Sequence, residues 1–208
     1  MPSRRSQVAQ RAGRVRAVVL DVDGVLTDGS LYYGSRGETL KRFHARDGFG
    51  IKMGHEAGLR VAVLSGRVAA PLKARLADLG VASEYVIQGS RDKATDLDRL
   101  ARALALAVEE IAFVGDDLPD LPALLRAGLA ACPADAVPEV RRVCHLVCRA
   151  TGGNGAVREV IQTVLTAQGR WADILRRWRG DPGKTAGERS GRRSRGSRSA
   201  GPGPILDA

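Results

Sequence analysis

Residues 15–25 read VRAVVLDVDGV, and this stretch decides the fold, because an apolar run ends on the two acids Asp21 and Asp23. We expect Val15–Val22 to form a buried strand of a parallel sheet. The spacing of the acids puts them on one side of an extended chain, where their charges repel unless a cation lies between them. Open α/β sheets bind ligands at the carboxyl ends of their strands. The alternative is a solvated turn in which the acids are incidental.

The rest of the chain alternates apolar runs with helical patterns, which predicts an α/β fold whose mostly parallel sheet is covered by helices on both faces. A Gly-rich turn between Ser30–Tyr33 and Glu38–Phe43 predicts a β-hairpin. Further strands are expected at Arg60–Leu64, Tyr85–Ile87, Ile111–Val114, Leu129–Ala131 and His145–Cys148. Helices are expected at Phe49–Ala57, Ala69–Leu79, Lys93–Leu106, Leu118–Ala127 and Ala156–Gln168. The pattern leaves open whether the last helix continues to Trp178.

The net charge of +10 is concentrated at the two ends of the 208-residue chain. Residues 1–16 hold five arginines and no acid, and residues 179–208 hold seven basic and three acidic side chains. The part between them is left with about +1, so a nucleic-acid partner is not expected for the folded domain. We expect a flexible basic N-terminus at residues 1–14, one domain at residues 15–178, and a disordered basic tail at residues 179–208.

The lengths of the apolar runs and the spacing of the cysteines indicate the compartment in which we expect the protein. No apolar run approaches the roughly 20 residues that span a bilayer, so no membrane partner is expected. Cys132, Cys144 and Cys148 form neither an even set nor a C-x-x-C pair, which is typical of reduced thiols in the cytoplasm. A competing hypothesis is a non-catalytic binding protein that uses its basic ends to hold nucleic acid or an acidic membrane surface.

Polar residues recur where other predicted strands end. Ser65 and Arg67 lie at the end of one strand, Lys93 begins a helix, and Asp116 lies in GDDLPD, residues 115–120. Acids after a strand supply hard oxygen ligands for Mg²⁺, although acids in the first turn of a helix are also common for structural reasons. Each signal is weak alone. Together, the order Asp-x-Asp, Ser, Lys and Gly-Asp-Asp resembles the haloacid dehalogenase superfamily.

That resemblance implies a magnesium-dependent phosphomonoester hydrolase with assigned roles. Asp21 would be the nucleophile that forms an aspartyl phosphate, and Asp23 would be the general acid and base. Mg²⁺ would be held by Asp21, the carbonyl oxygen of Asp23 and Asp116. Ser65 and Lys93 would donate to the phosphoryl oxygens, while Asp117 and Asp120 would orient Lys93 or metal-bound water.

Further motifs narrow the resemblance to one family without a cap domain. A hairpin and a helix already fill the chain between Asp23 and Ser65, which leaves no room for a cap there. The stretches that together resemble the 3-deoxy-D-manno-octulosonate 8-phosphate phosphatase family are DVDGVLTDG (21–29), the hairpin with Gly37-Glu38, RDGFG (46–50), SGR (65–67), GDD (115–117) and GGNGAVRE (152–159). The resemblance implies a Rossmann-like three-layer sandwich with a protruding hairpin. It also implies hydrolysis of that sugar-acid phosphate in the cytoplasmic pathway to lipopolysaccharide.

The family's sugar-acid contacts carry over to ten positions. They are Asp23, His44, Ala45, Arg46, Asp47, Gly48, Lys52, Arg67, Arg75 and Lys93. Cations among them suit a substrate that has a carboxylate as well as a phosphate. The alternative for Lys52 and Arg75 is a solvated helix face. His44 and Asn154 depart from the family pattern, so a nine-carbon sugar acid 9-phosphate stays an alternative substrate.

The resemblance also implies a homotetramer. An isolated two-stranded hairpin is marginal in water, so hairpins from several copies are expected to pair. Residues 152–159 would then reach the site of an adjacent protomer. The alternative for that segment is a glycine loop that leads into the last helix.

Overall fold

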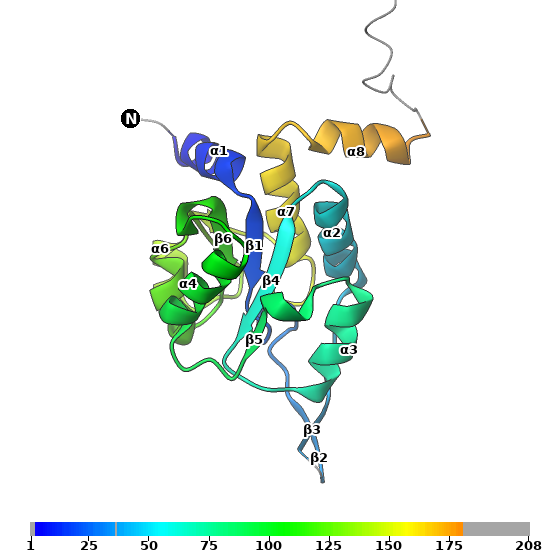
Figure 1. Cartoon of the computed structure of the whole chain (residues 1–208), viewed down its shortest axis with the longest axis vertical. Helices are drawn as coiled ribbons and strands as arrows, with labels where there is room; N and C mark the ends of the chain where they lie inside the picture. The colour runs from blue at the N-terminus through cyan, green and yellow to red at the C-terminus, as the bar shows by residue number, and fades with distance from the viewer. Residues whose placement is uncertain (1–2, 36, 181–208) are drawn as a thin grey trace, which may run out of the picture.

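The six-stranded sheet at the centre of the molecule is parallel at every strand pair, with the order β5-β4-β1-β6-β7-β8 (Figure 1). The computed structural model describes residues 3–35 and 37–180. The prediction of a mostly parallel α/β sheet is confirmed. The direction of winding reverses at β1, and such a reversal opens a ligand crevice at the carboxyl ends of the central strands. The strands are β1 (Ala17–Leu20), β4 (Arg60–Ser65), β5 (Val86–Gln88), β6 (Ile111–Val114), β7 (Leu129–Cys132) and β8 (Leu146–Val147).

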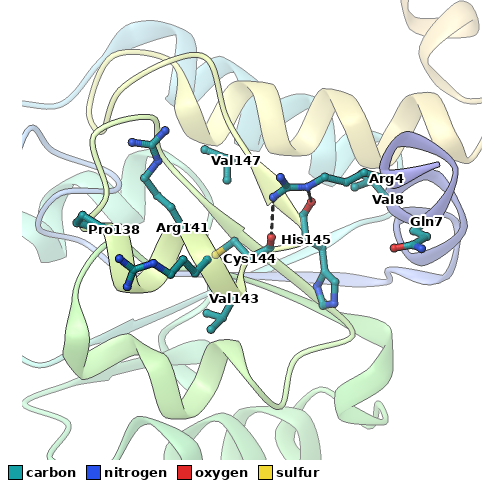
Figure 2. A pocket seen from close by; sticks show the side chains of 10 residues that line it. Arg4, Gln7, Val8, Pro138, Arg141, Val143, Cys144, His145 and Val147 are labelled. Atoms are coloured by element: carbon teal, nitrogen blue, oxygen red, sulfur yellow. Dashed lines mark hydrogen bonds between the residues drawn. The ribbon is translucent and has the colours of Figure 1, made fainter.

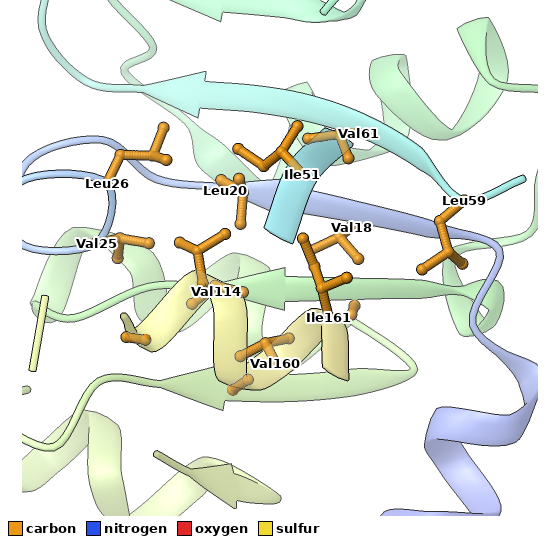
Figure 3. Close-up of a cluster of buried hydrophobic side chains, with 14 of the residues drawn as sticks. Val18, Leu20, Val25, Leu26, Ile51, Leu59, Val61, Val114, Val160 and Ile161 are labelled. Atoms are coloured by element: carbon orange, nitrogen blue, oxygen red, sulfur yellow. The ribbon is translucent and has the colours of Figure 1, made fainter. Parts of the chain in front are cut away.

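Helices cover both faces of the sheet, because successive side chains of each strand point to opposite sides. Val18 and Leu20 of β1 pack into one buried cluster (Figure 3), and Ala17 and Val19 pack into a second cluster on the other face. The first face is covered by α1 (Arg4–Arg14), α2 (Ala45–Glu56), α3 (Ala70–Asp78), α7 (Ala156–Ala167) and α8 (Trp171–Trp178). The second is covered by α4 (Lys93–Ala103), α5 (Leu121–Leu124) and α6 (Pro138–Val143).

Arg4–Arg14 form a helix, which corrects the expectation of a flexible N-terminus for the described part of residues 1–14. Helix α1 begins after Ser3, whose side chain accepts a backbone hydrogen bond at 3.2 Å, and it packs against α7 (Figure 1). Ala12 is fully buried, and Val8 packs against the same core. These residues lie four apart and therefore share one helix face, while most of the arginines stay exposed. Because arginines dominate the segment, this narrow apolar stripe was not recognised from the sequence.

Helix boundaries differ from the expected ones where proline or glycine interrupts the backbone. The segment expected as one helix at Leu118–Ala127 is a 3₁₀ turn, Leu118–Asp120, followed by the short α5. Pro119 and Pro122 explain this break, because proline lacks a backbone donor. The last helix divides into α7 and α8 at Gly169, which has a φ of 72°. Helix α6 was not expected at all. None of the described helices is both long and apolar enough to cross a membrane.

A β-hairpin projects beyond the carboxyl end of the sheet (Figure 1). Its strands, β2 (Tyr32–Gly34) and β3 (Gly37–Leu40), are antiparallel and largely exposed. Between Asp23 and Ser65 the described residues contain only this hairpin, α2 and β4 as regular elements, so no cap domain is inserted there. Of the basic tail expected at residues 179–208, all but the first two residues lie outside the described part of the chain.

Candidate active site

The polar residues singled out in the sequence meet at the carboxyl end of the sheet, where β1 lies between β4 and β6. Asp21 follows β1 directly, Ser65 is the last residue of β4, and Asp116 lies just after β6. Lys93 is the first residue of α4. These four residues line a cavity of about 330 Å³ together with Asp23, Gly24, Gly29, Gly66, Arg67, Ser90, Asp117, Pro119 and Asp120.

Lys93 connects two carboxylates inside this cavity. Its ammonium lies 2.8 Å from Asp21 Oδ1 and 2.5 Å from Asp120 Oδ1, and only 6% of its side chain is exposed. Burial alone would lower the pKa of Lys93, but the two carboxylates together raise it, so the amine stays charged. The other oxygen of Asp120 accepts hydrogen bonds from the backbone amides of Asp116 and Asp117 at 2.9 and 3.3 Å. Asp120 thus fixes both Lys93 and the loop after β6.

Three acids form a cluster that fits a divalent cation. Ligand oxygens of Asp21, Asp116 and Asp120 lie within 4.8 Å of one another. Burial, followed by repulsion from Asp120, raises the pKa of Asp21 to about 6 and that of Asp116 to about 8. Burial is the larger cause of both shifts and repulsion among the acids adds to it, so a cation placed beside them would favour their ionised forms. Hard oxygen ligands with excess negative charge are what Mg²⁺ binds, so these residues fit the metal.

The metal set expected from the sequence overlaps this cluster only in part. Asp21 and Asp116 belong to it, whereas the third carboxylate is that of Asp120, which was expected only to support Lys93 or water. Asp23 was expected to use its backbone carbonyl, and its side chain lies outside the cluster. Asp117, the other expected support, accepts a hydrogen bond from the amide of Leu118 at 2.7 Å and caps the 3₁₀ turn.

Gly24 lets the loop after β6 approach the loop after β1. It has a φ of 84°, and a Cβ placed on it would lie 2.1 Å from Asp116 Oδ2. Any side chain at this position would therefore collide with a carboxylate of the cluster, besides straining the backbone. The glycine of the Asp-x-Asp-Gly motif thus has a steric reason to be present.

Asp116→Asn should raise the thermal midpoint of the metal-free protein at about pH 8 and change it little near pH 4. The folded-state pKa of Asp116 is about 8, whereas an unfolded aspartate has a pKa of about 4. The folded state therefore holds the proton more tightly, and the stability that Asp116 contributes is lost as the pH rises between these values. The amide imitates the neutral acid and escapes this loss.

Differential scanning fluorimetry in a chelator checks this prediction, with the variant and the wild type compared at each pH. Adding Mg²⁺ should raise the midpoint of the wild type and leave the variant almost unchanged, since a ligand stabilises only the state that binds it. Midpoints that move in parallel for the two proteins, with pH and with Mg²⁺, would contradict the metal assignment.

Asp23 is held by two cations, one of which sequence reasoning missed. Lys41 forms an ion pair with Asp23 Oδ1 and lies 2.6 Å from Glu38 Oε1. Burial would lower the pKa of Lys41, but its hydrogen bonds to the two carboxylates and their charges raise it. Arg67 lies 3.5 Å from Asp23 Oδ2 and 3.1 Å from Glu38 Oε2. No motif marks Lys41, because only the folded hairpin returns it to the loop after β1.

Of the ten expected sugar-acid contacts, Asp23, Arg67 and Lys93 line the cavity. The structure gives residues 44–48 other partners. His44 caps α2, since its Nδ1 accepts a hydrogen bond from the amide of Arg46 at 3.2 Å. Asp47 is buried, and its carboxylate accepts hydrogen bonds from the backbone amides of Gly155 and Arg158 at 3.0 and 2.9 Å. It therefore binds the start of α7.

Gly48, Lys52 and Arg75 lie where α2 faces α3, whereas Arg46 lines a separate hollow with residues of α1 and α7. A Cβ on Gly48 would lie 2.1 Å from an Arg75 side-chain nitrogen, so Gly48 makes room for that arginine. Arg75 and Lys52 both pair with Asp78, at 2.7 and 3.6 Å. Ala45, the first residue of α2, is exposed. The structure does not bring these residues into the cavity around Asp21.

A larger hollow, of about 730 Å³, has different chemistry (Figure 2). Its lining includes Arg4, Arg141, Arg142 and His145 but neither aspartate nor glutamate. The pKa of its thiol, Cys144, is raised by a hydrogen bond with Cys132 and by burial, which makes it a poor nucleophile. The hollow therefore offers neither the acids nor the nucleophile found around Asp21.

Comparisons with known proteins agree with this geometry. The family model of haloacid dehalogenase-like hydrolases matches residues 31–128, a range that includes Ser65, Lys93 and Asp116 but begins after Asp21. The 3-deoxy-D-manno-octulosonate 8-phosphate phosphatase KdsC of Escherichia coli (strain K12) is 42% identical over 165 residues, which cover 79% of this chain and 87% of the relative.

Solved structures are similar over the same extent. The 3-deoxy-D-manno-octulosonate 8-phosphate phosphatase of Yersinia pestis aligns with a TM-score of 0.77 and 40% identity, covering 80% of this chain and 89% of that one. The Moraxella catarrhalis phosphatase of the same name, in complex with magnesium ion, phosphate ion and KDO molecule, aligns with a TM-score of 0.79 and 35% identity. That alignment covers 83% of this chain and 98% of the other.

Proposed function

Because the chain belongs to the 3-deoxy-D-manno-octulosonate 8-phosphate phosphatase family of haloacid dehalogenase-like hydrolases, we propose that it hydrolyses this sugar-acid phosphate to the free sugar acid and phosphate. The observation that carries the proposal is the cluster of Asp21, Lys93, Asp116 and Asp120 in one cavity at the carboxyl end of the sheet. The intact cluster favours an enzyme over a binding protein that acts through basic ends.

The reaction proceeds through an aspartyl phosphate. A carboxylate oxygen of Asp21 attacks phosphorus, the bond from phosphorus to the substrate oxygen breaks, and Asp23 gives its proton to that oxygen. Asp23 then takes a proton from water, whose oxygen attacks the phosphorus and releases Asp21. Mg²⁺, when bound by the acidic cluster, supplies positive charge that offsets the repulsion between phosphate and Asp21.

Lys93 and Ser65 serve the phosphoryl group. The Lys93 ammonium touches the nucleophile at 2.8 Å, so it lies where oxygens of a phosphate on Asp21 would need a donor. Ser65 is 2% exposed at the cavity wall, and its hydroxyl oxygen accepts the amide of Arg67 at 3.2 Å. Its hydroxyl proton stays available for a phosphoryl oxygen, because that contact uses only a lone pair.

Within the cavity, Arg67 is the cation best placed for the carboxylate of a sugar acid, since 40% of its side chain is exposed. Residues 44–48, Lys52 and Arg75 do not line the cavity and remain proposed contacts for a part of the substrate that extends beyond it. A nine-carbon sugar acid 9-phosphate is the alternative substrate, because Arg67 would bind its carboxylate equally well. We place the enzyme in the cytoplasm, in lipopolysaccharide biosynthesis, as its family membership implies.

Phosphate release from a panel of sugar phosphates, with Mg²⁺ and with a chelator, tests the function. Release should be fastest from the eight-carbon substrate and should stop in the chelator. Faster release from nine-carbon sugar acid 9-phosphates would reassign the substrate, and no release from any sugar-acid phosphate would overturn the proposal. Retention of nucleic acid on filters, steeply reduced by salt, would instead support the binding protein.

We also propose that the hairpin joins copies of this chain into a homotetramer. Leu31, Tyr33 and Leu40 are 44%, 65% and 57% exposed, which is costly on an isolated ribbon. Leu40→Lys should therefore lower the mass measured by light scattering from four chains towards one, and reduce the activity per chain. Leu125→Lys, just after α5, is the control, because this leucine is 69% exposed away from the hairpin. A fully active wild-type monomer would contradict the proposal.

A further inference from the structure

Lys41 is the most deeply buried cation near the cavity, although it lines neither the metal cluster nor the phosphate pocket. It follows β3 directly, and its side chain is 1% exposed, compared with 6% for Lys93 among the described residues. Its ammonium pairs with Asp23 Oδ1 and with Glu38 Oε1. A buried cation is unfavourable unless partners of this kind compensate for the lost water. The fold thus keeps a desolvated ammonium, which is unfavourable by itself, in contact with the side chain of Asp23.

The two oxygens of Asp23 have different environments. Oδ1 receives the Lys41 ammonium, which has only protons to donate. An acid proton therefore cannot sit between Oδ1 and Lys41, and the proton of a neutral Asp23 belongs on Oδ2. That oxygen lies 3.5 Å from Arg67 Nε, which is longer than a hydrogen bond, and Arg67 lines the cavity. Oδ2 is therefore the oxygen free to exchange a proton.

Glu38 holds the other side of Lys41 and joins it to the loop after β4. Its side chain is 6% exposed, with one oxygen 2.6 Å from Lys41 and the other 3.1 Å from Arg67. Arg67 also donates to the hydroxyl of Tyr33 at 2.9 Å. Lys41 consequently has little freedom to leave Asp23, because the contacts of Arg67 with Glu38 and Tyr33 also hold the hairpin in place.

We propose that Lys41 is a positioning residue for the acid and base of this enzyme: it holds Oδ1 of Asp23 and leaves Oδ2 as the oxygen that gives and takes the proton. The inference rests on the proposed function, since it takes Asp23 as the proton donor. It adds that the hairpin supplies a residue on which proton transfer depends. Without Lys41, Asp23 keeps its chemistry but loses its fixed orientation, and effective proton transfer requires that geometry.

Lys41→Met tests the proposal through kcat/KM on two substrates. For 3-deoxy-D-manno-octulosonate 8-phosphate, whose alkoxide needs a proton to leave, kcat/KM should fall about 10- to 100-fold, a part of what a general acid contributes. For 4-nitrophenyl phosphate, whose phenolate leaves without one, it should fall by less than about 3-fold. Lys73→Met, an exposed lysine on α3, is the control and should leave both values unchanged.

The outcomes separate this inference from the proposed function. Equal losses on the two substrates, or no loss on the sugar-acid phosphate, would overturn the positioning role. A wild type that cleaves 4-nitrophenyl phosphate and some alkyl phosphates, but not the sugar-acid phosphate, would overturn only the assigned substrate. The comparison of leaving groups then uses the alkyl phosphate that is cleaved. If Lys41→Met alone does not fold, the double variant Lys41→Met with Glu38→Gln removes both buried charges. Its losses of kcat/KM on the two substrates are then compared in the same way.

Discussion

Asp21→Asn should abolish turnover while the fold remains intact. The amide has nearly the shape of the carboxylate but no nucleophilic oxygen anion, so the phosphoenzyme cannot form. We expect the rate to fall by about 1,000-fold or more, because enzymes of this kind owe rate enhancements of at least ~10⁶ to their catalytic groups. The variant also removes one of three carboxylates from the acidic cluster, so Mg²⁺ should bind more weakly.

Steady-state phosphate release, with circular dichroism and a thermal midpoint for each protein, checks this prediction. Asp98→Asn is the matched control, because this aspartate lies on α4 and pairs with Arg126 at 2.8 Å, outside the residues that line the cavity. The control should keep wild-type activity. A tenth or more of wild-type activity in Asp21→Asn would show that the nucleophile lies elsewhere.

The parts of the site that sequence reasoning located are those at strand ends. Asp21, Ser65 and Asp116 each follow an apolar run, and parallel strands deliver their carboxyl ends to one edge. This rule needs only the chain order and the strand positions, both of which are visible as hydrophobic patterns. The sheet and the cavity around Asp21 could therefore be predicted before any contact was known.

Residues that act through distant contacts could not be found in this way. Asp47 was expected as a substrate contact, and no local pattern indicates that its carboxylate accepts hydrogen bonds from amides 108 and 111 residues further along the chain. Lys41 follows the hairpin and belongs to no motif, and its role depends on its ion pair with Asp23, 18 residues earlier in the chain. Local patterns carry no information on such pairings, because they depend on how separate elements pack.

The N-terminal helix shows a different limit. Composition suggested a flexible segment, because arginines dominate it, yet two apolar residues one helical turn apart pack against the core. Two of the arginines, Arg4 and Arg11, also donate to the carbonyl oxygens of Cys144 and Gly128, at 3.0 and 2.8 Å. Helices draw most of their stability from such packing rather than from propensity, so composition alone underestimates them.

Asp23→Asn should reduce kcat/KM for 3-deoxy-D-manno-octulosonate 8-phosphate by about 10²- to 10⁴-fold, the range that general acid–base groups contribute. The amide oxygen of the introduced asparagine can still accept a hydrogen bond from the Lys41 ammonium, as Oδ1 of Asp23 does. The side chain at position 23 should therefore stay in place. What disappears is the exchangeable proton. The substrate alkoxide must then leave without protonation, which is slow for an alkyl group.

Asp23→Asn should nevertheless react with 4-nitrophenyl phosphate, because nitrophenolate needs no proton to leave. Asp21 then becomes phosphorylated in a burst of one nitrophenol per active chain, and the phosphoenzyme accumulates, since the introduced amide cannot take the proton of the attacking water. Stopped-flow absorbance measures the burst, and mass spectrometry of the quenched protein locates the phosphate on Asp21. Equal losses for good and poor leaving groups, with no burst, would mean that Asp23 transfers no proton in the reaction.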